Sequence, residues 1–322
     1  MSELTVEELP GEDPSRMVWV QAGAHGDEVD GVLALELFMT AARATPPPVT
    51  LRVARPANPT AHREGARCAS TDGLDLNRCF PGDPTGSPTH RLGAELWSAV
   101  RTCDAVVDIH SSSLTLIGYP HVIVQAGDEP QHAAARAAAR ASGVPIVWRS
   151  TGAWLKGSLL HTATSAGLPT CLLDIGASRP WEPLPPLAPA LRRVLRTLPL
   201  QTSLSSSSPP SPLPPLAADQ LEIPDPQWLT APVAGAQLTC RAPGEVVEAG
   251  AEVFVVRGTD GRHAAVTWPG PDRGLVVTVR AGRAVSADTP VASVAMVAGA
   301  ATPGWTAAQR GAAGRQTDGQ QD

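Results

Sequence analysis

Segments with the apolar pattern of buried strands alternate along this chain with segments of helical spacing. MVWVQAGA (17–24) is a short apolar run that ends in Gly and Ala, and residues 31–43 carry apolar residues at helical spacing. After a TPPP stop, VTLRVA (49–54) has the pattern of the next strand. This alternation predicts an α/β fold, a mainly parallel mixed sheet covered by helices, with sites at the carboxyl ends of its strands. The pattern continues with strands expected at 104–110, 121–127, 144–150 and 168–176, and helices at 90–102, 128–142, 157–167 and 186–197.

The composition changes after the last of these helices. Residues 199–226 are rich in Ser and Pro, which predicts an extended linker. Residues 227–297 are short valine-rich runs separated by Gly, Pro and Asp, which predicts a small all-β domain. A weak internal repeat runs through it and favours two similar halves that close on each other. The equivalent positions are Val247 and Val285, Gly250 and Asp288, and Val253 and Val291.

This all-β segment resembles the barrel-sandwich fold of lipoyl and biotinyl carrier domains. Carriers of that kind hold their cofactor on a lysine at a hairpin tip, and the single lysine of this chain, Lys156, lies outside the segment. The carrier function is therefore excluded and only the scaffold is expected. Outside the two domains, 17–198 and 227–297, we expect an acidic N-terminal tail over 1–16 and a disordered, Gly-rich tail over 298–322.

Charge and composition exclude several classes of partner. The chain has 31 acidic and 25 basic residues, a net charge of −6, which argues against nucleic acid and gives no reason to expect an anionic membrane surface. A spanning helix needs an apolar run of about 20 residues, and the sequence contains none. The N-terminus lacks an export pattern, and the five cysteines are odd in number and scattered. We therefore expect a cytoplasmic protein with reduced thiols.

Two expected strand ends carry residues that can bind a metal. His25 and Glu28 follow the strand at 17–24, and His110 ends the apolar run DAVVDIH. Two histidines and one glutamate are a known zinc set that leaves one coordination position open. Taken singly, His25 and Glu28 also suit a charged surface turn, and His110 a half-buried strand end. Asp108 faces the same side of its strand as His110 and is either its hydrogen-bond partner or a capping carboxylate. The remaining histidines, His121 among them, lack ligand spacing and are assigned to the surface or the core.

A long polar loop, 58–87, places three arginines close together in sequence. Arg78 stands next to Asn77, and a guanidinium beside an amide suits bidentate binding of a substrate carboxylate. A second arginine near a metal can stabilise an oxyanion. An ordinary surface loop is the alternative.

At these residues the chain resembles the succinylglutamate desuccinylase/aspartoacylase family, a branch of the zinc carboxypeptidase-like fold. The motifs that carry the resemblance are GAHGDE, NPTA, GAR, DLNRCFPGDPTGS, the DIH strand end and LPTCLLDIG. They span about residues 17–198, and the C-terminal segment also looks like the second domain of that family.

The resemblance implies a role for each matching residue. His25, Glu28 and His110 match the ligands of one zinc ion per chain. Arg67 matches the arginine that polarises the scissile carbonyl. Asn77 and Arg78 match the pair that grips the free carboxylate of the substrate.

One position departs from the family pattern. Where the family has a glutamate that serves as general base and acid, this chain has Asp174, which is one methylene shorter. A misplacement of about 1 Å can cost on the order of a hundredfold in rate. Three outcomes stay open: a compensating shift that keeps the enzyme active, a slow enzyme or one that uses a nearby group such as Glu182, or a zinc site that only binds a ligand.

The expected function is therefore zinc-dependent hydrolysis of an amide bond in a small carboxylate-bearing substrate, such as an N-acyl amino acid. In that reaction zinc activates a water molecule, Asp174 moves the proton from water to the departing amine, and Arg67 stabilises the oxyanion. A carboxypeptidase acting on peptides is the alternative enzyme, a catalytically impaired zinc-site binding protein is a second class, and an interaction scaffold is a third. The expected partner is a small molecule, and homo-oligomer formation is left open.

Overall fold

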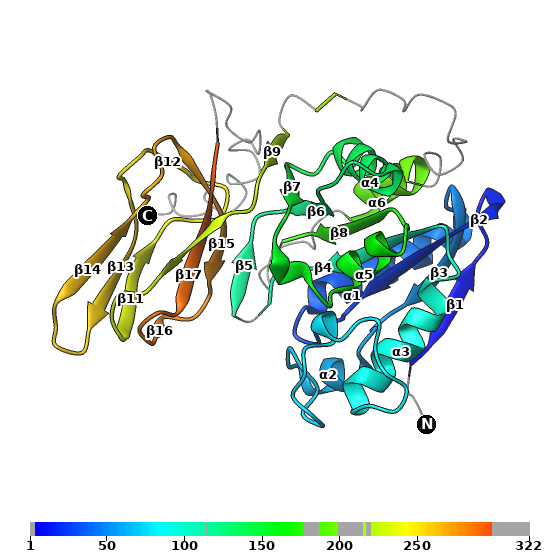
Figure 1. The fold of residues 1–322 in the computed structure, drawn as a ribbon, viewed down its shortest axis with the longest axis horizontal. Helices are drawn as coiled ribbons and strands as arrows, with labels where there is room; N and C mark the ends of the chain where they lie inside the picture. Colours follow the sequence, from blue (N-terminus) through cyan, green and yellow to red (C-terminus); the bar gives the residue numbers. More distant parts are fainter. Residues whose placement is uncertain (1–3, 114, 177–186, 199–214, 217–219, 298–322) are drawn as a thin grey trace, which may run out of the picture.

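The computed structural model describes residues 4–113, 115–176, 187–198, 215–216 and 220–297 of the chain. Its largest sheet has eight strands in the order β1-β3-β2-β4-β8-β6-β7-β9 (Figure 1). The pairs β1–β3 and β6–β8 are antiparallel and the other pairings are parallel, so the sheet is mixed. The strands are β1 (Val6–Leu9), β2 (Asp13–Ala22), β3 (Val49–Ala54), β4 (Ala105–His110), β6 (His121–Gln125), β7 (Ile146–Ser150), β8 (Thr170–Asp174) and β9 (Leu221–Ile223).

Helices cover both faces of this sheet. Successive residues of a strand point to opposite faces, and neighbouring Val20 and Trp19 of β2 belong to different buried clusters. Val20 packs in the cluster of α1, α4 and α6, and Trp19 in that of α3 and α5. The helices are α1 (Val29–Ala44), α2 (Pro59–Glu64), α3 (Pro88–Val100), α4 (Pro130–Ala141), α5 (Leu159–Ser165) and α6 (Leu187–Thr197), with 3₁₀ turns η1 (Leu76–Arg78) and η2 (Ala153–Leu155).

The expected acidic tail at 1–16 is wrong where the structure describes it. Residues of β1 pair antiparallel with β3, and β2 begins at Asp13. The acidic side chains are matched to arginines: Glu7 pairs with Arg55 at 2.9 Å and with Arg43, and Glu8 pairs with Arg52. A segment that looks too polar for a strand is therefore stabilised at the sheet edge by hydrogen bonds and ion pairs.

The C-terminal part consists of two antiparallel sheets. One has the order β10-β17-β15-β12, and the other β14-β13-β11-β16. The two halves of the predicted repeat occupy equivalent places, since Val253 and Val291 are both second residues of strands, and Gly250 and Asp288 both have positive φ, 76° and 61°. The barrel-sandwich assignment stays a prediction. The strands are β10 (Gln227–Thr230), β11 (Gly235–Cys240), β12 (Val246–Val247), β13 (Glu252–Gly258), β14 (His263–Thr267), β15 (Gly274–Arg280), β16 (Ala284–Val285) and β17 (Pro290–Met296).

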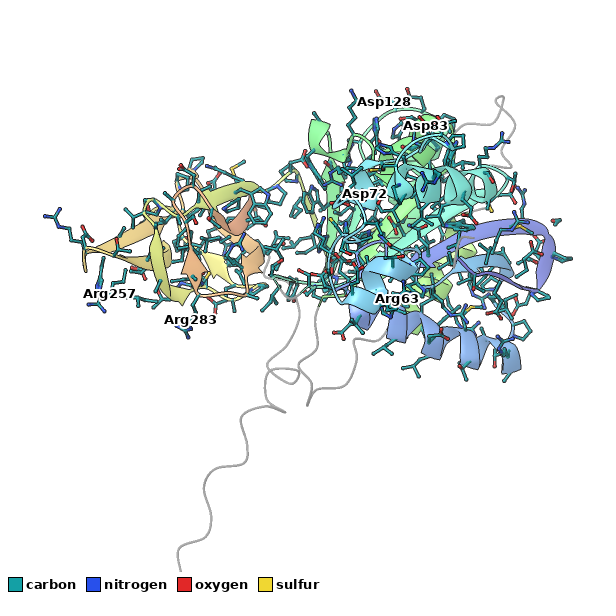
Figure 2. All side chains as sticks on the ribbon, turned by 90° about the horizontal axis from the view of Figure 1, so that it is seen from below. Arg63, Asp72, Asp83, Asp128, Arg257 and Arg283 are labelled. Carbon is teal, nitrogen blue, oxygen red and sulfur yellow. The ribbon has the colours of Figure 1, made fainter. Side chains whose placement is uncertain are left out.

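Two strands join the parts of the molecule. β5 (Leu116–Gly118), which follows β4 in the chain, pairs antiparallel with β15 of the C-terminal part. β9, at the end of the expected linker 199–226, pairs in parallel with β7 and so belongs to the large sheet. In Figure 2 the labelled Arg257 and Arg283 lie on the C-terminal sheets, away from the α/β part that carries Asp72 and Asp83.

Several expectations fall outside the described residues. These are most of the linker (199–214 and 217–219), the tail 298–322 and Glu182. Among the helices that are described, none is long and apolar enough to cross a bilayer.

Candidate metal centre and active site

The three predicted zinc ligands come together at the carboxyl ends of two adjacent strands. His25 follows β2, Glu28 is the N-cap residue of α1, and His110 is the last residue of β4, which pairs with β2. One potential ligand atom from each side chain lies within 4.8 Å of the others, and all three residues are buried. This is the topological placement that the alternating sequence pattern predicts.

Both imidazoles are oriented by carboxylates. Nε2 of His25 lies 3.0 Å from Oδ1 of Asp75, and Nε2 of His110 lies 3.2 Å from Oδ2 of Asp108. A carboxylate accepts these Nε2–H bonds, which leaves Nδ1 of each ring as the metal-binding atom. The two Nδ1 atoms face the same carboxylate, at 2.7 and 2.8 Å from the Oε1 and Oε2 atoms of Glu28. Two imidazole nitrogens and one carboxylate so arranged fit the preferences of zinc.

The surroundings of Glu28 and Asp75 favour the ionised form of each carboxyl. Burial acts to raise the pKa of Glu28, but the imidazoles of His110 and His25 hold it below its usual range. Burial acts in the same way on Asp75, whose pKa is held low by His25 and Arg67. Asp108, for which the sequence left two roles open, accepts a hydrogen bond from Gln21 at 3.0 Å and also contacts His110. It is therefore the buried partner of the histidine and does not cap the strand.

The three loop residues expected to contact substrate border this cluster. Arg67 lies 2.9 Å from Asp75 and 3.7 Å from Glu28, with its side chain 40% exposed. Asn77 is buried; its Oδ1 accepts the backbone N–H of Leu159 at 2.9 Å, and its Nδ2 lies 3.3 Å from Nε2 of His110.

Arg78 is held between the backbone and an aromatic ring. Its Nη1 donates to the carbonyl of Asn77 at 2.6 Å, and its guanidinium lies 5.9 Å from the ring centroid of Trp154. This contact orients the cationic group over the cavity that it lines.

Asp174 ends β8 directly beside His110. The two residues are register partners on neighbouring strands, and Oδ1 of Asp174 accepts the N–H of Gly176 at 2.8 Å. Burial raises the pKa of the Asp174 carboxyl.

His121 is the register partner of Asp174 on its other side. Its Nδ1–H donates to the carbonyl of Tyr119 at 2.8 Å, so a neutral ring carries its acceptor on Nε2. The sequence assigned His121 to the surface or the core, but it lines the cavity. It follows a proline at the start of a strand and has no ligand spacing, so sequence alone carried no signal for it.

A cavity of about 450 Å³ connects these groups. Its lining combines the predicted site with three tryptophans that the sequence did not predict, Trp148, Trp154 and Trp228. Trp228 of β10 and Thr278 of β15 belong to the C-terminal part, which therefore contributes to the cavity. A second hollow of about 500 Å³, against α2 and α3, is lined by none of the predicted site residues.

Comparison with known proteins places the chain in a family. Residues 14–186 match the model of the succinylglutamate desuccinylase/aspartoacylase catalytic domain. An N-alpha-acetyl-L-2,4-diaminobutyric acid deacetylase from Halomonas elongata is 35% identical over 141 residues, which cover 42% of this chain and 40% of that protein. The match thus spans well under half of that relative.

Solved structures share the fold over nearly the whole chain. An aspartoacylase family protein from Mesorhizobium loti has a TM-score of 0.75 at 19% identity, covering 92% of this chain and 89% of that one. An ectoine utilisation protein from Ruegeria pomeroyi, solved with bound product, has a TM-score of 0.72 at 21% identity, covering 91% and 88%. With the catalytic-domain match extending over more than half of its length, the chain belongs to the succinylglutamate desuccinylase/aspartoacylase family.

Proposed function

We propose that this protein is a zinc-dependent hydrolase that cleaves the amide bond of an N-acyl amino acid. The observation that carries the proposal is the convergence of His25, Glu28 and His110 from separate segments, with both Nδ1 atoms on the same carboxylate. The deacetylase from Halomonas elongata, named for an acetylated amino acid, supports this class of substrate.

The residues of the chain divide the work as follows. His25, Glu28 and His110 would hold a zinc ion, which would supply Lewis acidity to the amide carbonyl and the attacking water. Asp174 accepts the proton of the water and returns it to the departing amine. Because burial raises the pKa of Asp174, its carboxyl is better matched to both steps than an exposed aspartate would be.

Two arginines act on charge at opposite ends of the substrate. Arg67 borders the ligand cluster, at 3.7 Å from Glu28, and is placed to stabilise the oxyanion that develops on the carbonyl. Arg78 holds the free carboxylate, with its guanidinium kept in place by Trp154 and the Asn77 carbonyl. Asn77 is fixed because its side-chain oxygen accepts the backbone N–H of Leu159, at the start of α5. This anchors the loop at the residue before Arg78 and so helps to position the Arg78 guanidinium.

The shorter side chain of Asp174 has glycine backbone beside it. Gly118 of β5 faces the carboxylate, and a Cβ atom at that position would lie 3.9 Å from both Asp174 oxygens. The carboxylate is held by Gly176 at the strand end, so it projects into the cavity from a fixed base.

The test combines metal analysis with a substrate screen. Purified protein is expected to bind one zinc ion per chain, and His110→Ala to lose it. Zinc-loaded protein is then assayed for released primary amine on N-acetyl, N-formyl and N-succinyl amino acids and on dipeptides. Turnover of N-acyl amino acids supports the proposal, whereas turnover of dipeptides alone favours a carboxypeptidase. Zinc binding without any turnover favours a binding protein, and the absence of stoichiometric zinc overturns the proposal.

A further inference from the structure

The aromatic side of the cavity is built on the same sheet face as Asp174. Leu172 lies two residues before Asp174 on β8 and is the register partner of Ile123, whose partner on β7 is Trp148. These three apolar side chains therefore form a row across the sheet beside the reacting groups, and all three line the cavity.

Trp148 and Trp154 form an aromatic wall whose two indoles are fixed by a single carboxylate. Oδ1 of Asp225 accepts the Nε1–H of Trp148 at 2.9 Å and that of Trp154 at 3.3 Å. The two ring centroids lie 5.3 Å apart. A pre-positioned aromatic surface can bind an apolar group without the entropic cost of ordering the rings.

Asp225 has little capacity left to bind a ligand. Its oxygens also accept hydrogen bonds from the hydroxyl of Ser150 at 2.5 Å and the backbone N–H of Thr151 at 2.9 Å. Together with the two indoles these donors occupy the lone-pair sites of the carboxylate. Its role is to hold the wall.

Positive charge at the cavity comes from two side chains, one of which lies against Trp154. Among the described residues that line it, the arginines are Arg67 and Arg78. Arg67 is paired with Asp75, which leaves Arg78 as the anchor for one substrate carboxylate. A second carboxylate on the substrate side chain would meet indole rings and Asp225, where burial without a partner is unfavourable.

We infer that the wall of Leu172, Ile123, Trp148 and Trp154 is a subsite for a large apolar side chain. The substrate is then the N-acyl derivative of an aromatic or large aliphatic amino acid, with its one carboxylate on Arg78 beside Trp154. This inference rests on the proposed function, and it separates this chain from relatives named for dicarboxylate substrates.

The experiment measures binding and turnover side by side. Zinc-loaded Asp174→Asn protein, in which turnover is expected to be slow, is titrated calorimetrically with N-acetylphenylalanine, N-acetylaspartate, N-acetyllysine and N-acetylalanine, and kcat/KM is measured for each with the unmodified zinc-loaded enzyme. N-acetylphenylalanine is expected to bind most tightly, and its kcat/KM to exceed that of N-acetylaspartate by about 100-fold or more. Preference for N-acetylaspartate, for N-acetyllysine through cation–π contacts, or for none of the four overturns the subsite.

Variants at Trp154 test the wall directly. This side chain is 41% exposed, so its truncation is not expected to unfold the protein. Because Trp154 also contacts Arg78, its loss affects every substrate with a free carboxylate, and this common effect cancels in the ratio of two substrates. Trp154→Ala should therefore lower the ratio of kcat/KM for N-acetylphenylalanine to that for N-acetylalanine by about tenfold or more, and Trp154→Phe should restore most of that ratio. Equal losses for both substrates in Trp154→Ala contradict the subsite.

The two proposals fail in different ways. Ranked binding without hydrolysis of any ligand would overturn the hydrolase and leave the subsite standing. Hydrolysis of all four compounds at similar kcat/KM would leave the hydrolase standing and overturn the subsite.

Discussion

Nε2 of His25 lies 3.0 Å from Oδ1 of Asp75, a residue 50 positions further along the chain. This carboxylate fixes the ring so that Nδ1 faces Glu28. We predict that Asp75→Asn lowers zinc affinity by about 10- to 100-fold, because an amide orients the ring less well and makes it less basic. Competition with a chelator of known affinity measures the change.

Asp83→Asn is the matched control for this prediction. Asp83 lies in the same long loop, is exposed, and accepts hydrogen bonds from the backbone and hydroxyl of Thr85. It should bind zinc as the unmodified protein does. Equal affinity in Asp75→Asn and Asp83→Asn would show that Asp75 does not orient the ligand.

Asp174 should separate acid–base chemistry from zinc binding. We predict that Asp174→Asn lowers kcat by about 10²- to 10⁴-fold with zinc content unchanged, since an amide cannot take the proton. Asp174→Glu keeps a proton acceptor, and Gly118 leaves room for it, so its loss should be smaller. If Asp174→Asn turned over as fast as the unmodified enzyme, Asp174 would have no role in proton transfer.

Arg78 should set the preference for a free carboxylate. We predict that the unmodified enzyme prefers an N-acetyl amino acid to its C-terminal amide, and that Arg78→Ala lowers this preference by about 10- to 100-fold. The ratio of the two kcat/KM values gives the effect, because general losses cancel in it. Arg91→Ala, an exposed arginine of α3 outside this cavity, is the control. A ratio unaltered in Arg78→Ala would place the carboxylate elsewhere.

Glu222 should make stability depend on pH in the acid range. Burial acts to raise its pKa, but hydrogen bonds from Arg136 and Arg140 lower it, at 2.6 and 2.7 Å. The pKa of Glu222 is therefore lower in the folded than in the unfolded protein. The ion pairs of ionised Glu222 with the two arginines stabilise the fold fully above about pH 4.3, and this stabilisation is lost as the pH falls through the folded-state pKa. Because Glu222 is only partly buried, solvent screens these contacts, and Glu222→Gln should lower the free energy of unfolding by about 1 kcal/mol at pH 7, and by less in acid.

Denaturant unfolding at two pH values checks this. The exposed pair of Arg262 and Asp260, 3.8 Å apart, supplies the control, and Asp260→Asn should leave stability unchanged at both. A deficit for Glu222→Gln that is the same at both pH values would mean that the ion pair is not its source.

The parts of the fold that sequence predicted are those in which apolar periodicity and burial agree. The strand around Val20 and the helix around Leu35 are apolar on the faces that they bury, so local pattern and tertiary packing give the same answer. The strands β1 and β9 were not predicted because they have no apolar periodicity. Their acidic residues Glu8 and Glu222 form ion pairs with arginines on distant elements. A short polar segment that pairs at the edge of a sheet has no apolar periodicity by which sequence analysis could detect it.

The same distinction separates the site residues that sequence predicted from those that it did not. His25 and His110 were predictable because His25 follows one apolar strand and His110 ends another, and the two strands are neighbours. Asp75 opens the motif DLNRCFPGDPTGS but was given no role from sequence, and His121 and Asp225 lie outside every motif, because all three contact residues far along the chain. The aromatic wall depends on the β6–β7–β8 register, which composition does not reveal.

Trp228 should limit the length of the substrate. Its side chain is 42% exposed, stands on β10 of the C-terminal part, and borders the cavity together with Thr278. We predict that Trp228→Ala raises kcat/KM for N-acetyl dipeptides relative to N-acetyl amino acids by about tenfold, because removing the indole ring widens the cavity on that side. Val233→Ala, an exposed position of the same part that does not line the cavity, should leave the ratio as it is. If both variants keep the unmodified ratio, the C-terminal part does not restrict substrate length through this ring, and the limit lies with the α/β walls of the cavity.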